Sequence, residues 1–374
     1  MAKIRVLIID DSVVIRRLVT MYLTSDPAIE VVGTAADGSI GLAKISHLNP
    51  DLIVLDIEMP VMDGLQTLIE IRRLYKKLPV IMFSTLTERG AAITLEALAL
   101  GANDYATKSI TAGTARQHIC EELIPKIKAL CQGMVTPSVS SQIHSVLKSA
   151  AVFPGTSAKH APIGILAIGV STGGPNALAA LIPELSRDFP VPVVIVQHMP
   201  PMFTRMLAER LATMSGFPIR EGKAGEQVRP GEMWVAPGGL HMEVEKIADA
   251  VRLRTHDEPP ENSCRPAVDV LFRSVAQVYG PRALAVVLTG MGQDGLRGCE
   301  LIRESGGRVL AQDEASSVVW GMPGAVCKAG LAEKVLPLQE LAPEINRLVG
   351  PGSRRVEKPS LAISLTKMLG VGAP

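Results

Sequence analysis

Residues 163–175 read I-G-I-L-A-I-G-V-S-T-G-G-P, and this stretch indicates the fold of the second half of the chain. Ile163–Val170 is a short apolar run with β-branched residues, which predicts a buried parallel strand. Pro175 suits the first turn of a following helix, where a missing N–H costs nothing. We therefore predict a strand, a glycine-rich turn and a helix, with Ser171 exposed at the carboxyl end of a sheet.

Two later strands of the same kind also end next to polar residues. His198 follows Val191–Gln197 in V-Q-H-M-P-P, and Asp294 follows Ala283–Thr289 in T-G-M-G-Q-D-G. Open α/β sheets bind ligands just beyond the carboxyl ends of their strands. A hydroxyl, an imidazole and a carboxylate at that edge favour a nucleophilic hydrolase, with Ser171 as nucleophile, His198 as base and Asp294 orienting the base.

The residues alone leave other interpretations open. A glycine-rich turn can also cradle a phosphate, although a dinucleotide site would want an acid about 20 residues on, where Gln197 and His198 stand. The chain has no G-K-[ST] sequence after the turn. His241, in a hairpin-like stretch, and His256, in a proline-rich loop, compete with His198 as the base.

The first 131 residues alternate short apolar runs with amphipathic stretches of helix length. Five such units predict a parallel sheet with helices on both faces. The expected strands are Arg5–Ile9, Glu30–Ala35, Leu52–Leu55, Val80–Phe83 and Asp104–Ala106.

Carboxylates follow the first and third of these strands: Asp10, Asp11 and Asp56. Such a cluster favours a bound hard cation, and Mg²⁺ prefers oxygen ligands. Ser84 and Lys108, at the ends of the fourth and fifth strands, suit the oxygens of a phosphoryl group on Asp56. The alternative is that each acid simply caps a helix.

The rest of the chain divides by composition. We predict a first domain over residues 1–131, a Ser/Thr/Gly/Pro-rich linker over 132–160, a second domain over 161–350 and a tail over 351–374. A short helix is expected at Ser141–Ala151 within the linker. A hairpin insertion is expected near Met233–Arg254, where A-P-G-G-L separates two alternating stretches.

Composition narrows the class of protein. The 374 residues carry 38 Lys and Arg against 37 Asp and Glu, so no basic excess favours a nucleic acid partner. The first apolar run is too short for a signal peptide or a membrane span, which predicts a cytoplasmic protein without membrane insertion. Five cysteines without C-x-x-C spacing indicate free thiols rather than disulfides or zinc.

The N-terminal motifs D-D-S, D-I-E-M-P-V-M-D-G, F-S-T and D-Y-A-T-K resemble the receiver domains of two-component response regulators. The resemblance implies a flavodoxin-like (βα)5 fold and phosphorylation of Asp56. It also implies a Mg²⁺ site of Asp10, Asp11, Asp56 and the Glu58 carbonyl, and a switch formed by Ser84 and Tyr105 with Lys108. Ser109 departs from the family's pattern, since most receivers have proline after the lysine, and this leaves the position of Lys108 open.

The second domain resembles the catalytic domain of chemotaxis protein-glutamate methylesterases. The resemblance is carried by S-T-G-G-P, Q-H-M, R-P-A-V-D-V-L-F, T-G-M-G-Q-D-G and Q-D-E-A-S-S-V-V-W-G-M-P. It implies a doubly wound, mainly parallel sheet with the Ser171, His198 and Asp294 triad. The Met291 backbone, and more weakly Thr172, are implied as oxyanion donors. Cys264 and Ala267 stand where many relatives have His and Ser.

The resemblance implies hydrolysis of glutamate methyl esters on the cytoplasmic helices of chemoreceptors, with release of methanol. Many relatives also deamidate receptor glutamines. The reaction itself needs no cofactor, Mg²⁺ serves the receiver, and a histidine kinase supplies the phosphoryl group. The remaining alternatives are a receiver-controlled binding module without catalysis and a DNA-binding regulator, which the apolar second half disfavours.

Overall fold

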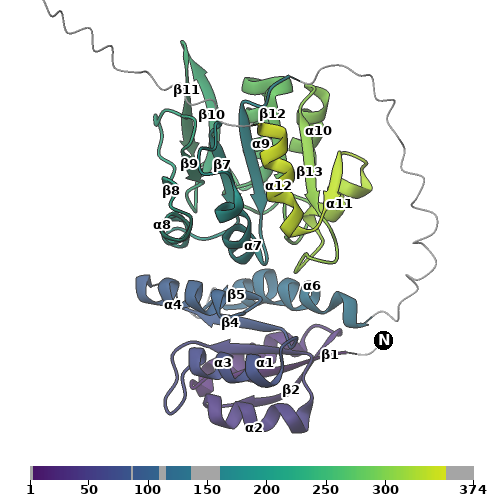
Figure 1. Ribbon diagram of the computed structural model, residues 1–374. Helices are drawn as coiled ribbons and strands as arrows, with labels where there is room; N and C mark the ends of the chain where they lie inside the picture. The colour runs from purple at the N-terminus through teal and green to yellow at the C-terminus, as the bar shows by residue number, and fades with distance from the viewer. Residues whose placement is uncertain (1–2, 86, 109–114, 136–160, 351–374) are drawn as a thin grey trace, which may run out of the picture.

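The computed structural model describes residues 3–85, 87–108, 115–135 and 161–350. Figure 1 shows two α/β units in contact, the N-terminal one in purple and blue below the second in teal to yellow. The helix expected at Ser141–Ala151 and the tail expected over 351–374 lie outside the described residues.

The first unit is a five-stranded parallel sheet in the order β2-β1-β3-β4-β5, which confirms the five predicted βα units. Helices cover both faces, so β3, β4 and β5 are buried throughout and β1 nearly so, whereas the edge strand β2 is buried only at its two ends. The elements are β1 (Ile4–Ile9), α1 (Val13–Thr24), β2 (Ile29–Ala35), α2 (Gly38–Leu48), β3 (Leu52–Asp56), α3 (Gly64–Leu74), β4 (Val80–Ser84), α4 (Glu88–Ala99), β5 (Asp104–Thr107), α5 (Ala115–His118), the π-helical turn η1 (Ile119–Leu123) and α6 (Ile124–Val135). Helix α6 thus continues four residues into the segment expected as linker.

The second unit is a seven-stranded sheet in the order β14-β13-β12-β6-β7-β9-β8, with every pair parallel. Its strands are β6 (Ile165–Val170), β7 (Val193–Gln197), β8 (Ile219–Glu221), β9 (Met233–Val235), β12 (Ala283–Val287), β13 (Arg308–Gln312) and β14 (Lys334–Leu336). Its helices are α7 (Gly174–Leu181), α8 (Phe203–Ser215), α9 (Val268–Tyr279), α10 (Leu296–Glu304), α11 (Met322–Lys328) and α12 (Leu338–Val349), with 3₁₀ turns η3 (Ile182–Glu184) and η4 (Gly280–Arg282).

Strand β6 is the middle strand of this sheet, and this position explains why its residues are apolar throughout. Leu166, Ile168 and Val170 pack into the cluster on one face of the sheet, while Ile165 and Ala167 pack into the cluster on the other. A strand with two buried faces needs an apolar residue at every position. The polar residues are therefore confined to its end, which places Ser171 at the sheet edge.

The predicted hairpin is present, but its turn was misplaced. Strands β10 (His241–Ile247) and β11 (Ala250–His256) pair antiparallel and turn at residues 248–249, where Ala248 has a φ of 52°. The A-P-G-G-L stretch instead connects β10 to β9, which belongs to the parallel sheet. Proline and glycine marked a break between strands, but not a two-residue hairpin turn.

The first unit covers one end of the second through α4 and β5. The rings of Tyr105 and Phe203 stack with centroids 4.9 Å apart, and both side chains are buried. Asn176 Nδ2 donates to the Leu98 carbonyl at 2.7 Å. The guanidinium of Arg210 donates to the Leu95 carbonyl, and Arg205 pairs with Glu88 at 2.8 Å. One apolar cluster runs through both units.

Among the described residues, none of the helices has the length and apolar character needed to cross a lipid bilayer.

Candidate active site

Ser171, His198 and Asp294 line one cleft at the carboxyl edge of the second sheet. Ser171 directly follows β6, His198 directly follows the neighbouring β7, and Asp294 lies in the loop after β12. The cleft has a volume of about 560 Å³. The three sequence candidates are thus brought together by adjacent strands, as the strand-end argument predicted.

The turn that carries Ser171 is held from both sides. The Ser171 N–H donates to the Thr289 carbonyl at 3.0 Å, and Gln197 Nε2 donates to the Ser171 carbonyl at 3.0 Å. A Cβ at Gly174 would lie 1.9 Å from Gln197 Oε1, so only glycine permits this approach. Gln197 therefore helps to position the Ser171 turn. In the sequence, Gln197 was notable only because it stands where a dinucleotide-binding site would have an acidic residue.

His198 uses its two ring nitrogens differently. Nε2 lies 2.7 Å from Asp294 Oδ2, and Nδ1 lies 3.5 Å from Cys264 Sγ. An ionised carboxylate accepts only, so Nε2 carries a proton, and in the neutral ring the lone pair lies on Nδ1. Among the hydrogen bonds of the described residues, none joins Ser171 Oγ to His198. Proton transfer from Ser171 to Nδ1 thus requires a closer approach than this structure has, as is common without substrate.

Electrostatics favour a charged His198–Asp294 pair. Burial disfavours the imidazolium, but hydrogen bonding to Asp294 and contact with Cys264 outweigh it and raise the pKa of His198. Burial also opposes ionisation of Asp294, yet the hydrogen bond from His198 and two backbone N–H groups hold the pKa of Asp294 below its usual value. The carboxylate therefore stays ionised and stabilises a protonated imidazole.

Asp294 is fixed at the N-terminus of α9. Its oxygens accept from the backbone N–H groups of Val268 at 2.6 Å and Asp269 at 3.0 Å, and from Gly295 N at 3.0 Å. Unpaired N–H groups and the helix dipole both favour an anion there. The carboxylate is 2% exposed and has little freedom to turn.

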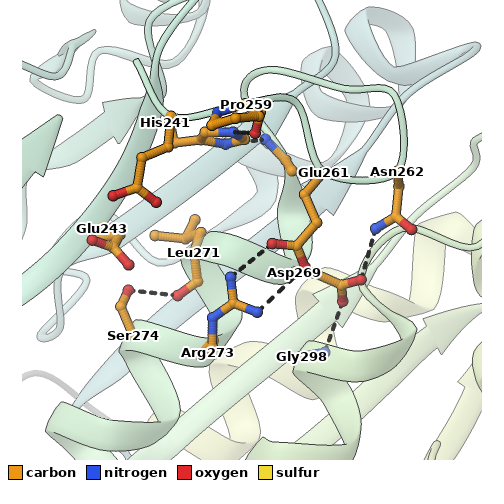
Figure 2. Close-up of polar contacts among 12 residues, drawn as sticks. His241, Glu243, Pro259, Glu261, Asn262, Asp269, Leu271, Arg273, Ser274 and Gly298 are labelled. Atoms are coloured by element: carbon orange, nitrogen blue, oxygen red, sulfur yellow. Dashed lines mark hydrogen bonds and ion pairs between the residues drawn. The ribbon is translucent and has the colours of Figure 1, made fainter. Parts of the chain in front are cut away.

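A second carboxylate, Asp269, shares Asn262 with Asp294, and Figure 2 shows the contacts of Asp269 with Asn262 and Gly298. Asn262 Nδ2 donates to Asp269 Oδ2 at 2.8 Å and to Asp294 Oδ1 at 2.9 Å. Asp269 Oδ1 accepts from the Gly298 N–H at 2.7 Å, and burial raises the pKa of Asp269. Neither Asn262 nor Asp269 had been singled out from the sequence, because their roles depend on side-chain contacts across loops.

The other sequence candidates occupy different places. Met291 and Thr172, the expected oxyanion donors, both line the cleft. The loop that carries Met291 approaches Ser171 closely, because a Cβ at Gly290 would lie 2.8 Å from Ser171 Cβ. His241, the first residue of β10, is buried, with Nε2 3.1 Å from the Pro259 carbonyl (Figure 2). His256 faces Glu243 at 3.4 Å. Neither histidine lines the cleft, so neither is placed to act as its base.

The N-terminal unit forms one wall of the same cleft. Asp104, Tyr105, Glu121, Glu122 and Lys126 line it opposite Ser171 and His198. Lys126 Nζ donates to the Tyr105 carbonyl and pairs with Asp104 at 3.5 Å. The first unit therefore narrows access to the candidate catalytic residues.

The carboxylates of the first unit meet at the edge of its own sheet. Asp10, Asp11 and Asp56 each offer an oxygen within 4.8 Å of the others. Lys108 Nζ lies 2.8 Å from Asp10 and 2.6 Å from Asp56, so its position is defined although Ser109 itself lies outside the described residues. Burial raises the pKa of Asp56 to about 6, and Lys108 partly offsets this effect. Three crowded carboxylates against one ammonium suit a divalent cation.

These acids are not the helix caps of the alternative interpretation. Ser12 caps α1 and Asp63 caps α3. Asp11, Asp56, Glu58, Ser84 and Lys108 line a separate cavity of about 280 Å³. Tyr105 points away from this cavity into the contact with Phe203, which links the two units.

Comparison with known proteins identifies both halves. A profile of the CheB methylesterase family matches residues 166–345, and one of the response regulator receiver domain matches residues 6–120. A protein-glutamate methylesterase/protein-glutamine glutaminase of Trichodesmium erythraeum is 53% identical over 94% of this chain and 100% of its own. One of a Nocardioides species is 51% identical over 93% of this chain and 96% of its own. The crystal structure of the Thermotoga maritima CheB methylesterase catalytic domain matches with 40% identity and a TM-score of 0.49, over 50% of this chain and 100% of that chain.

Proposed function

Because this chain belongs to the family of protein-glutamate methylesterase/protein-glutamine glutaminases that carry a receiver domain, we propose that Ser171, His198 and Asp294 hydrolyse glutamate methyl esters on chemoreceptor helices. The chain is a carboxylic ester hydrolase of this class and a response regulator. The observation that carries the residue assignment is the 2.7 Å pair of His198 and Asp294 in the cleft that Ser171 lines.

The reaction follows from the two nitrogens of His198. Nδ1 takes the proton of Ser171 as Oγ attacks the ester carbonyl, and Asp294 stabilises the imidazolium through Nε2. The oxyanion is bound by backbone N–H groups of the turn and loop that meet at Ser171, with Met291 and Thr172 as the candidates. The imidazolium then protonates methanol as it leaves. Water attacks the acyl-enzyme with the same base, which regenerates Ser171 and releases the glutamate.

Deamidation of receptor glutamines uses the same groups. Ser171 attacks the amide carbonyl, His198 protonates departing ammonia, and hydrolysis leaves the same glutamate. The cleft suits a side chain presented on the surface of a helical rod, because it is open and lined by both units. We propose that the chain reaches the receptor helices without inserting into the membrane.

In the receiver, Asp56 accepts the phosphoryl group from a histidine kinase. Asp10, Asp11 and Asp56, with the Glu58 carbonyl, would hold Mg²⁺, whose charge offsets the phosphoryl oxygens when it is bound. Lys108 and Ser84 bind the oxygens of the phosphoryl group, because an ammonium and a hydroxyl face that position. The esterase reaction itself uses no cofactor.

Phosphorylation is proposed to open the cleft. The receiver wall, the Tyr105–Phe203 stack and the contacts of Arg210 and Asn176 favour a closed arrangement. Phosphorylation replaces the single carboxylate charge of Asp56 with a phosphoryl group that carries roughly two, a net gain of about one negative charge, and can shift a two-state interface. A tenfold activation requires a change of only about 1.4 kcal/mol in the free energy between the closed and open states.

The first test measures methanol release from methylated receptor membranes, with and without a small phosphodonor and Mg²⁺. We expect the phosphodonor to raise the rate of the wild-type protein at least tenfold and to leave Asp56→Asn at its basal rate. Asp51→Asn, which removes a carboxylate elsewhere in the receiver, is the matched control and should respond like wild type. Absence of methanol release in both states would exclude the methylesterase assignment.

The closed arrangement is tested by loosening the contact between the units. Arg210→Ala removes the hydrogen bond to the Leu95 carbonyl, and we expect the rate without phosphodonor to rise several-fold. Arg187→Ala removes a guanidinium elsewhere in the same unit and serves as control. An unchanged basal rate in Arg210→Ala and in a variant that also carries Asn176→Ala would argue against steric control by the receiver.

A further inference from the structure

Cys264 and His198 come from loops 66 residues apart, yet Cys264 Sγ lies 3.5 Å from His198 Nδ1. Asp294 occupies the other ring nitrogen, and the three groups together form a cluster with metal-ligand chemistry. We propose that Cys264 and His198 bind Zn²⁺, with Asp294 supporting the histidine, and that bound zinc reversibly inhibits the esterase. The inhibition rests on the proposed function, whereas the binding does not.

The distance between the two ligand atoms already fits zinc. A tetrahedral ion with Zn–S of about 2.3 Å and Zn–N of about 2.05 Å holds these atoms roughly 3.5 Å apart. Sγ and Nδ1 therefore need little movement to share one ion. The side chains of Cys264 and His198 are half-buried and line the cleft, so an ion reaches them from solvent.

Asp294 gives the histidine the tautomer that zinc needs. A zinc-bound imidazole commonly donates its second N–H to a carboxylate, which fixes the ring and raises its basicity as a ligand. Here Asp294 accepts from Nε2 at 2.7 Å, so Nδ1 is the atom that faces Cys264. Its lone pair is free in the neutral ring, and zinc binding to the imidazolium releases the Nδ1 proton to solvent. On binding, the Cys264 thiol releases its proton to solvent and the thiolate coordinates the ion. Water fills the remaining positions.

The charge around the cleft also favours a cation. Among the charged residues that line it, the acids Asp104, Glu121, Glu122 and Asp294 outnumber the cations Lys126 and Arg265. Mg²⁺ prefers oxygen ligands and does not compete for a thiolate–imidazole pair, whereas zinc binds sulfur and nitrogen well. The receiver carboxylates and the Cys264–His198 pair therefore select different ions.

Inhibition follows because one lone pair serves two purposes. Nδ1 takes the proton of Ser171 in the proposed reaction, and the same atom binds zinc. An enzyme molecule with zinc bound has no base, so methanol release stops until the ion leaves. A chelator should restore the rate fully, since no covalent bond is made.

Binding is tested on the reduced full-length protein with Co²⁺ as a spectroscopic substitute for Zn²⁺, in excess Mg²⁺ to occupy the receiver carboxylates. We expect a thiolate-to-cobalt charge-transfer band that saturates near one equivalent and disappears on addition of Zn²⁺. Cys264→Ser and Cys264→Ala should both lose the band, and Cys120→Ser, the control in the receiver, should keep it. A wild-type protein without the band, or a band that survives in both Cys264 variants, would overturn the site.

Inhibition is tested by methanol release under the same conditions. Zinc should inhibit the wild-type protein and EDTA should reverse this, while the Cys264 variants should need at least tenfold more zinc for half-inhibition, whatever their basal rates. Equal sensitivity of wild type and variants would overturn the inhibitory role even where the cobalt band is present. A Cys264-dependent band in a protein that releases no methanol would refute the proposed function and leave the binding site standing.

Discussion

Replacement of Ser171 by alanine should lower methanol release by about 10⁶-fold, to the background rate, because loss of a triad nucleophile removes covalent catalysis altogether. The turn that holds Ser171 is fixed by backbone groups and by Gln197, so the variant should keep its structure. The measurement is the initial rate of methanol release from methylated receptor membranes, with phosphodonor present, together with a thermal melt.

Ser263→Ala is the matched control, since it removes a hydroxyl from the same cleft. It should stay within tenfold of wild type. If Ser171→Ala kept even a tenth of the wild-type rate, Ser171 would not be the nucleophile, and another group would have to attack the ester.

The second large effect is expected at Asp294. Asp294→Asn should lower the rate by about 10⁴-fold, because an amide at this position no longer holds the N–H on Nε2 and no longer stabilises the imidazolium. Asp269→Asn is a matched control, since Asp269 is equally buried and shares Asn262 with Asp294 but does not contact His198. It should lose far less activity.

The pH dependence of the rate distinguishes an effect of Asp294 on His198 from a general loss of structure in Asp294→Asn. Neutral His198 is the active form of the base, so the rate rises as pH rises through its pKa. Asp294 raises the pKa of His198, and removal of the negative charge should therefore move this limb to lower pH in Asp294→Asn. A profile that is merely scaled down, with the limb unmoved, would show that Asp294 does not act through His198.

The sequence predicted the features of the fold and site that strands determine, and it did not predict the features that loops determine. Apolar runs with buried faces identified the two parallel sheets, and the carboxyl ends of adjacent strands brought Ser171 beside His198. Asp294 reaches the N-terminus of α9 through the shape of the eight-residue loop between β12 and α10, which no periodicity encodes. The hairpin turn at Ala248 was missed because it contains neither glycine nor proline.

Side-chain contacts between distant segments were also beyond sequence reasoning. Asn262 has a backbone φ of 53°, and in this turn its amide donates to both Asp269 and Asp294. Cys264 read as an ordinary free thiol because its partner is on another strand end. Zinc sites are recognised in a sequence by ligands a few residues apart. The proposed ligands Cys264 and His198 are 66 residues apart in the chain and approach each other only in the folded protein.

The stack of Tyr105 on Phe203 also has a thermodynamic consequence. Opening the cleft exposes two buried rings to water, and burial of each is worth roughly 1.5–3 kcal/mol. Because the free energy gained from apolar burial falls on cooling, this contact should stabilise the closed form less at low temperature than at high temperature. If the cleft opens as proposed, the resting activity of the unphosphorylated protein should therefore depend on temperature with the heat-capacity signature of an apolar interface.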